Sequence, residues 1–222
     1  MIPATPTPLF AIYGASGCGR GIMPLARTML RRQNIAAERL VFLDDAPTER
    51  NVNGHAVLTF DEFIETAASQ RWVNIAIANS VVRQKLAERC QLAGVLPWTV
   101  TADNVVIMDD VTLGEGAALS PFVTLTSNIR IGRFFHANLY SYVEHDCVIG
   151  DFVTFAPGVH CNGNVVIEDH AYIGAGAVIK QGRPGAPLVI GAGAVVGMGA
   201  IVTRSVPSGT TVVGNPARPM VR

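Results

Sequence analysis

Several features of an average globular protein are scarce or missing in this sequence of 222 residues. Charged residues make up only 15%, and 17 Lys and Arg balance 17 Asp and Glu, so neither a nucleic acid nor an anionic membrane is expected as a partner. The four cysteines show no CxxC spacing, which argues against a disulfide framework or a Cys-rich metal site and favours a reducing, cytoplasmic setting. No apolar run approaches the ~20 residues that span a bilayer, and the first residues do not resemble a signal peptide.

Apolar and turn-forming residues are abundant instead. Hydrophobic residues reach 49%, with 22 Gly and 13 Pro, which indicates a substantial core and many tight turns between short strands. From Ile107 to Ile179 an apolar residue recurs every six positions, through 72 residues without a slip. A second residue, mostly small or branched, follows each lead residue four positions later. The pattern breaks at residues 182–187 and resumes at Ile190.

A period of six fits neither an α-helix nor a coiled coil, but it fits a short strand plus a tight turn. Three such units close a triangular coil of eighteen residues, and successive coils stack about 4.8 Å apart through parallel ladders. The spacing therefore predicts a parallel β-helix whose interior is filled by the lead residues. We expect glycines at corners that need a positive φ.

The first hundred residues follow a different pattern. Strands are expected at 9–13, 40–43 and 72–78, and helices at about 20–32, 60–68 and 81–93. This alternation predicts a small parallel sheet with helices on its faces, a Rossmann-like βαβ domain. The predicted architecture is α/β plus β, with domains at 1–98 and 99–222.

A glycine turn and an acidic pair lie at the carboxyl ends of the first two predicted strands, where parallel sheets bind ligands. The turn runs from Gly14 to Gly19, and its backbone N–H groups and the following helix N-terminus could hold a phosphate. Asp44 and Asp45 could accept hydrogen bonds from a ribose or a base. The glycine spacing differs from the dinucleotide-binding fingerprint, so a plain tight turn and a nicotinamide-dependent enzyme both stay open.

His145 is the candidate general base on the coil. It lies between Glu144 and Asp146, at the third place of its repeat, so its side chain should project outward beside a carboxylate. One coil further on lies Gly163, which leaves room for a substrate carbonyl and offers an N–H to bind it. The alternative is a solvated surface histidine. The histidines fall in different columns, so no metal site within one chain is expected, although a site shared between copies stays open.

Six stretches in the same order and spacing make the whole chain resemble bacterial hexapeptide-repeat acetyltransferases of nucleotide-linked amino sugars or sialic acids. It is most similar to the UDP-4-amino-sugar N-acetyltransferases of glycan biosynthesis. The matching stretches are residues 13–17 (YGASG), 42–45 (FLDD), 75–79 (IAIAN), 144–150 (EHDCVIG), 163–165 (GNV) and 214–218 (GNPAR).

The resemblance implies a left-handed β-helix behind the N-terminal domain and a homotrimer with active sites between subunits. It implies His145 as the base, supported by Asp146, and acetyl-CoA as co-substrate in a groove between neighbouring coils, contacting Gly163. The nucleotide sugar would bind through Ser16, Gly17, Cys18, Asp44, Asp45 and Ala78. The sequence departs from the family where Cys18 and Thr154 replace histidines, and Thr154 stands where the family residue helps to place the acetyl donor.

The leading hypothesis is transfer of acetyl from acetyl-CoA to the amine of a UDP- or dTDP-linked amino sugar, with direct attack assisted by His145. A Cys147 nucleophile is disfavoured because its place in the repeat points inward. Acetylation of a sugar or sialic acid hydroxyl is the alternative enzyme. A metal-dependent hydratase and a non-catalytic nucleotide-sugar sensor are alternatives of other classes.

Overall fold

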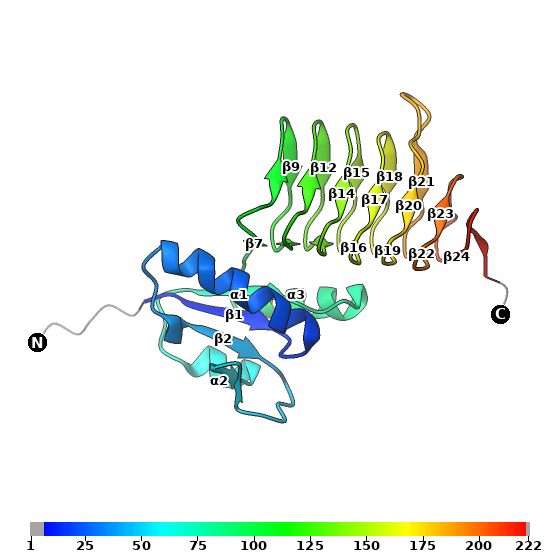
Figure 1. Cartoon of the computed structure of the whole chain (residues 1–222). Coiled ribbons are helices and arrows are strands. Elements are labelled where there is room, and N and C mark those ends of the chain that lie inside the picture. Colours follow the sequence, from blue (N-terminus) through cyan, green and yellow to red (C-terminus); the bar gives the residue numbers. More distant parts are fainter. Residues whose placement is uncertain (1–6, 221–222) are drawn as a thin grey trace, which may run out of the picture. The chain divides into compact units, whose positions relative to one another are not determined.

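The computed structural model describes residues 7–220, and these divide into two compact units, Met1–Val100 and Thr101–Arg222 (Figure 1). The first unit carries the three α-helices, and the second is built almost entirely from short strands. Each unit has its own sheets, so the sequence pattern changes where the architecture changes.

The first unit is a six-stranded sheet in the order β3-β4-β2-β1-β5-β6, with helices packed on it. All neighbouring pairs are parallel except β3 with β4. The expected βαβ alternation is confirmed. The strands are β1 (Leu9–Tyr13), β2 (Leu40–Leu43), β3 (Asn51–Val52), β4 (His55–Leu58), β5 (Arg71–Ile75) and β6 (Leu96–Pro97), and the helices are α1 (Gly17–Arg32), η1 (Ala37–Arg39), α2 (Phe60–Glu65) and α3 (Ser80–Leu92).

Burial explains why these segments take these forms. Every residue of β1 and β2 is buried, as expected for central strands of a parallel sheet covered on both faces. Helix α1 buries one stripe, formed by Ile22, Met23, Ala26 and Leu30. Two helices begin at side-chain caps: Thr59 forms a capping box with Glu62, and the Asn79 side chain accepts from the Val82 N–H.

Two details of this unit differ from the sequence prediction. The third predicted strand ends at Ile75, because the buried Arg83 side chain takes the carbonyls of Ile77 and Ala78 out of the ladder at 2.6 and 3.2 Å. The β3–β4 hairpin was not predicted, since its strands are too short to leave a period-two pattern.

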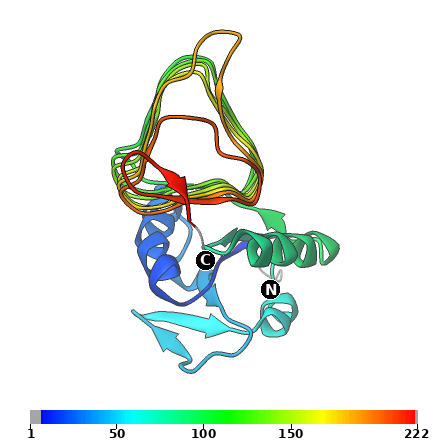
Figure 2. The same ribbon diagram turned by 90° about the vertical axis from the view of Figure 1, so that its right-hand side faces the viewer.

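The second unit is a parallel β-helix, as predicted, and the view along its axis shows the triangular outline of the coils (Figure 2). Its three sheets run in the orders β25-β24-β22-β19-β16-β13-β10-β7, β23-β20-β17-β14-β11-β8 and β21-β18-β15-β12-β9. The strands are β7 (Val100–Thr101), β8 (Val106–Ile107), β9 (Val111–Leu113), β10 (Ala118–Leu119), β11 (Thr124–Leu125), β12 (Ile129–Ile131), β13 (His136–Ala137), β14 (Tyr142–Val143), β15 (Val148–Ile149), β16 (Thr154–Phe155), β17 (His160–Cys161), β18 (Val165–Ile167), β19 (Tyr172–Ile173), β20 (Val178–Ile179), β21 (Leu188–Ile190), β22 (Val195–Val196), β23 (Ile201–Val202), β24 (Thr211–Val213) and β25 (Arg218–Pro219).

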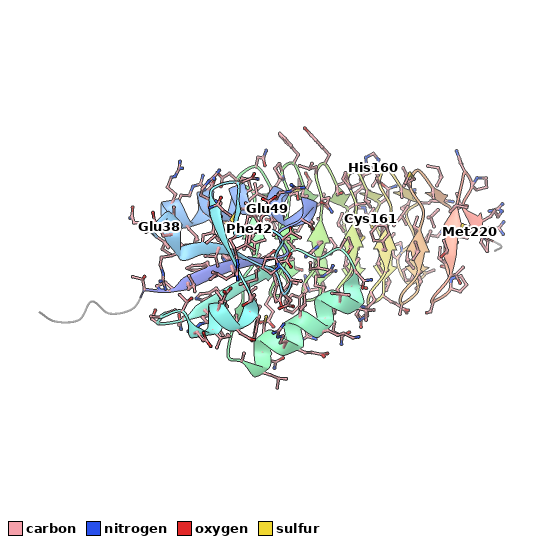
Figure 3. All side chains as sticks on the ribbon, turned by 90° about the horizontal axis from the view of Figure 1, so that it is seen from below. Glu38, Phe42, Glu49, His160, Cys161 and Met220 are labelled. Carbon is pink, nitrogen blue, oxygen red and sulfur yellow. The ribbon has the colours of Figure 1, made fainter. Side chains whose placement is uncertain are left out.

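The interior of the coil follows the six-residue repeat. Lead residues from Leu119 to Ile179 are buried, and the predicted stacking of Tyr142 on His160 is confirmed by strand pairing. Neighbours within a strand face opposite ways, as His160 and Cys161 of β17 do: the first is exposed and the second buried (Figure 3). Ile107 is an exception at 46% exposed, because no coil precedes its own within the β-helix.

The corners of the coil differ from the expectation that glycine would occupy positions with positive φ. Many corners with positive φ carry side chains rather than glycine, and three of them form an aromatic stack: Phe134 on Phe152 at 5.1 Å and Phe152 on His170 at 5.3 Å between ring centroids. This stacking offsets the cost of the left-handed backbone conformation. Glycines after lead residues serve close approach instead: a Cβ at Gly132 would lie 2.7 Å from the backbone of the next coil.

Candidate active site

His145 stands at the corner between β14 and β15, with its side chain 56% exposed. Its Nδ1 lies 2.7 Å from a carboxylate oxygen of Asp146. Asp146 holds this position because its backbone turns through φ +58, a conformation that Asp and Asn tolerate better than most residues. The corner therefore fixes the imidazole through one ring nitrogen and leaves Nε2 directed away from that contact.

The surroundings of His145 raise its pKa above the ordinary value of 6.5. The hydrogen bond that the His145 Nδ1–H donates to the Asp146 carboxylate is the main cause of this raised pKa, and the charges of Asp146 and Glu144 add to it. A nearby carboxylate favours the charged imidazolium, so it makes the neutral ring a stronger base. The predicted pair of base and supporting acid is thus brought together by the fold.

Gly163 lies directly against this ring, one coil along the axis. A Cβ at this position would approach His145 Cε1 to 2.6 Å and Nε2 to 2.7 Å, so a larger residue would push the imidazole aside. The Gly163 N–H donates to no other residue that the structure describes. A free N–H beside a free imidazole nitrogen can bind a carbonyl oxygen while the base takes a proton.

Cys147 points away from this corner. Its side chain is buried inside the coil beside Cys161, and its Sγ donates to the carbonyls of His145 and Asn162. A buried thiol has no access to an acyl donor at the surface, which favours direct transfer over an acyl-enzyme.

Thr154 does not join His145. It belongs to β16, where it pairs with His136 and Tyr172, and this strand lies in a different sheet from β14 and β15. The predicted stacking on His136 is confirmed. Within one chain, however, the structure does not bring Thr154 to the corner that holds the base.

In the glycine turn after β1, two glycines are required by the backbone and its packing, whereas a third faces open space. A Cβ at Gly19 would overlap the Gly14 carbonyl oxygen, and Gly14 itself has φ +112, so both positions need glycine. Gly17 differs: a Cβ there meets nothing within 4 Å. Ser16 is the N-cap of α1, yet its hydroxyl makes no capping hydrogen bond. The N-terminus of α1 thus presents open space and an uncommitted hydroxyl where an anion can bind.

A cavity of about 280 Å³ opens beside this helix end. Ser16 and Asp44, two of the residues predicted to bind substrate, line it together with Arg20, Glu49 and residues of the β3–β4 hairpin. One Asp44 oxygen accepts from the Ala46 N–H at 3.0 Å, which fixes the carboxylate. Sequence reasoning missed Arg20 and Glu49; the place of Arg20 in the first turn after the glycines was a usable signal.

Asp45 makes other contacts. One carboxylate oxygen accepts from the Tyr13 hydroxyl at 2.7 Å and the other from Arg89 at 2.8 Å. The Arg89 guanidinium also lies 4.0 Å above the Phe60 ring. Burial and the Asp45 carboxylate raise the pKa of Tyr13. Asp45 therefore links the end of β2 to β1 and α3 through hydrogen bonds. No local motif in the sequence predicts this network.

Cys18 and Ala78 meet at Arg83 rather than in the cavity. Burial raises the pKa of the Cys18 thiol, and the Arg83 charge partly opposes that rise. The same guanidinium donates to the Ala78 carbonyl at 3.2 Å, and burial lowers the Arg83 pKa to about 10. Neither Cys18 nor Ala78 lines the cavity that Ser16 and Asp44 share.

Residues 7–220 contain neither a metal-ligand cluster nor a membrane-spanning helix. Across that range, no three His, Cys, Asp or Glu side chains are grouped so that they could hold a metal ion. Within the same range no helix is long and apolar enough to span a membrane.

The comparisons with known proteins cover both units. Residues 10–90 match the PglD N-terminal domain family, and residues 146–181 match the bacterial transferase hexapeptide family (six repeats). GDP-perosamine N-acetyltransferase of Escherichia coli O157:H7 is 53% identical over 214 residues, 96% of this chain and 97% of that protein.

Two solved structures are similar over almost the whole chain. WeeI from Acinetobacter baumannii AYE has a TM-score of 0.94 at 57% identity, covering 96% of this chain and 100% of that one. The acetyltransferase domain of PglB from Neisseria gonorrhoeae FA1090, in complex with acetyl coenzyme A, has a TM-score of 0.85 at 27% identity, covering 96% and 100%.

Proposed function

Because this chain belongs to the nucleotide-sugar N-acetyltransferases that join a PglD N-terminal domain to hexapeptide repeats, we propose that its acceptor is a GDP-linked amino sugar of the perosamine type. The chain is an acetyl-CoA-dependent N-acetyltransferase. The observation that carries the proposal for GDP is the 53% identity to GDP-perosamine N-acetyltransferase over 97% of its length. The proposed nucleotide differs from the UDP or dTDP expected from the sequence.

His145 is the general base of this reaction. The neutral sugar amine attacks the thioester carbonyl, a C–N bond forms, and Nε2 of His145 takes a proton from the nitrogen. The N–H of Gly163 stabilises the oxyanion of the tetrahedral intermediate. The C–S bond then breaks, and the CoA thiolate receives the proton from the imidazolium. The Asp146 contact of 2.7 Å to Nδ1 supports these roles, because it leaves Nε2 to carry the transferred proton.

The nucleotide of the acceptor binds at the N-terminus of α1. The uncommitted Ser16 hydroxyl and the open space at Gly17 suit the diphosphate, and Arg20 supplies a cation beside them. Asp44, with one oxygen held by Ala46, accepts from the ribose or the base. Asp45 acts through its neighbours, because both of its oxygens already accept from Tyr13 and Arg89.

The active form is a homotrimer with its sites between subunits. Val148, next to the His145 corner, is 48% exposed, and Val166 and Val189 stack beyond it on the same outer face. Covering this apolar stripe with another copy would remove it from water. The four free cysteines support a reducing, cytoplasmic location.

Acceptor panels test the proposal. The purified protein would be incubated with acetyl-CoA and GDP-perosamine, UDP- and dTDP-linked 4-amino sugars, or sialic acid, and the products identified by mass spectrometry. We expect N-acetylation with the highest kcat/KM for the GDP-linked sugar. A preference for a UDP- or dTDP-linked amine would refute the nucleotide assignment, and acetylation of sialic acid alone would refute amine transfer. Light scattering would check the trimer.

A further inference from the structure

The peptide group between Asn162 and Gly163 differs from its neighbours in its hydrogen bonds. The peptide groups directly before and after it each bond to the coils on both sides, at distances between 2.8 and 3.3 Å. This peptide forms no backbone hydrogen bond with any residue among 7–220. The ladders of the β-helix therefore leave its orientation open, although its N–H, that of Gly163, is the proposed donor to the oxyanion.

Contacts inside the coil set the direction of this peptide. The Asn162 carbonyl accepts from the Cys147 thiol at 3.3 Å and from the Cys161 thiol at 3.8 Å, and both thiols are buried. The carbonyl therefore points into the coil. In a planar trans peptide the carbonyl and the N–H point in opposite directions. The Gly163 N–H consequently points out of the coil, and the His145 ring lies against the same glycine.

Contacts outside the coil hold the Asn162 side chain. Its Oδ1 accepts from the Tyr142 hydroxyl at 2.9 Å, and its Nδ2 donates to the Ile179 carbonyl at 2.9 Å. Tyr142 lies on the coil that carries the base, and Ile179 lies on the coil that follows Asn162. Asn162 is therefore bound to the coils on both sides, and its side chain cannot rotate while both hydrogen bonds persist.

Tyr142 is itself held in place. Its ring stacks on the His160 ring at 4.8 Å between centroids, with 19° between the ring planes. Burial raises the pKa of Tyr142 above its ordinary value, and the Glu144 charge adds to the rise. The Tyr142 hydroxyl therefore keeps its proton near neutral pH and remains the donor to Asn162.

We infer that Tyr142 is a positioning residue of the acetyl transfer, which acts through Asn162 on the oxyanion donor at Gly163. This inference rests on the proposed function. Tyr142 precedes the base by three residues, so its hydroxyl links the strand before His145 to the peptide that carries the donor N–H. The base and the donor are thereby held in a fixed arrangement across two coils, because an oxyanion is stabilised best by a donor that is oriented in advance.

A double-mutant cycle on kcat tests the inference, at saturating acetyl-CoA and GDP-linked amino sugar. Tyr142→Phe removes only the hydroxyl, and we expect kcat to fall about 3–10-fold, the effect of one hydrogen bond. Asn162→Ala removes the side chain through which Tyr142 acts and should lower kcat about 10–100-fold. The double variant should be no slower than Asn162→Ala alone, because the two residues act as one unit.

Tyr140→Phe is the matched control. Tyr140 lies on the same coil, is 62% exposed, and its hydroxyl bonds to no residue in the described range 7–220. Tm and both KM values should stay near wild type in Tyr142→Phe and in Tyr140→Phe, while kcat falls only in the first. The acid limb of kcat against pH should not move in Tyr142→Phe, because the contact between His145 and Asp146 is untouched.

Three results would refute the inference while leaving the proposed function intact, provided that the wild-type protein acetylates the amino sugar. The first is wild-type kcat in Tyr142→Phe. The second is a double variant whose loss is the product of the single losses, because Tyr142 would then act independently of Asn162. The third is a lowered Tm with equal rises in both KM values, which would indicate a distorted coil. Wild-type protein that acetylates no amino sugar would overturn the proposed function and this inference together.

Discussion

Replacing Gly163 by Ala tests the corner at its tightest point. The new Cβ would lie 2.6 Å from His145 Cε1, and an ordinary contact needs at least 3.4 Å, so the ring must move by about 0.8 Å. The side chain is half exposed and can swing outward, which keeps the fold intact but breaks the 2.7 Å contact with Asp146. A displacement of this size costs about 100-fold in rate, equivalent to about 2.7 kcal/mol of transition-state stabilisation.

The assay is a steady-state rate at saturating acetyl-CoA and amino sugar, followed by release of the CoA thiol. Gly21→Ala is the matched control, because a Cβ at this exposed position in α1 meets nothing within 4 Å. We expect Gly163→Ala to lower kcat about 100-fold with Tm almost unchanged, and Gly21→Ala to leave both kcat and KM alone. A Gly163→Ala variant with wild-type kcat would refute the stacked arrangement of glycine and base.

Two further predictions concern the pH profile and the acceptor site. Asp146→Asn removes the main cause of the raised His145 pKa. The acid limb of the profile of kcat against pH should therefore move to lower pH, and its plateau should fall. Asn fits this corner, because Asn128 and Asn164 adopt the same positive φ in the same column. An acid limb at the wild-type pH would contradict the role of the Asp146 contact in raising the His145 pKa. Gly17→Ala should raise KM for the nucleotide sugar about tenfold or more, because the methyl group enters the open space proposed for the diphosphate. Tm should not fall, because helix propensity favours Ala over Gly. An unchanged KM would place the diphosphate elsewhere.

The coil was predictable because its order is local. One interior residue every six positions fixes strand length, coil size and register together, so the stacking of His145 on Gly163 followed from counting eighteen residues. The corner conformations were not predictable in this way. Phe134, Phe152 and His170 adopt positive φ through contacts with neighbouring coils, and no single six-residue unit contains those contacts.

The proposed acceptor site was predictable only in part. Ser16 and Asp44, which line the cavity, were predictable because they follow the carboxyl ends of β1 and β2. The same logic could not distinguish Asp44 from Asp45, because the partners of Asp45 are Tyr13, 32 residues away, and Arg89, 44 residues away. Similarly, the break in the repeat was visible in the sequence. Its position at the corner of the base depends on which sheet each strand joins, so it required the structure.

The central claim is that the imidazole of His145 takes the proton from the attacking amine. The most direct measurement is kcat of His145→Ala at saturating concentrations of both substrates, with KM for each determined in parallel. The account predicts that kcat falls by ~10²–10⁴ while both KM values change little. Turnover near the wild-type rate would contradict it.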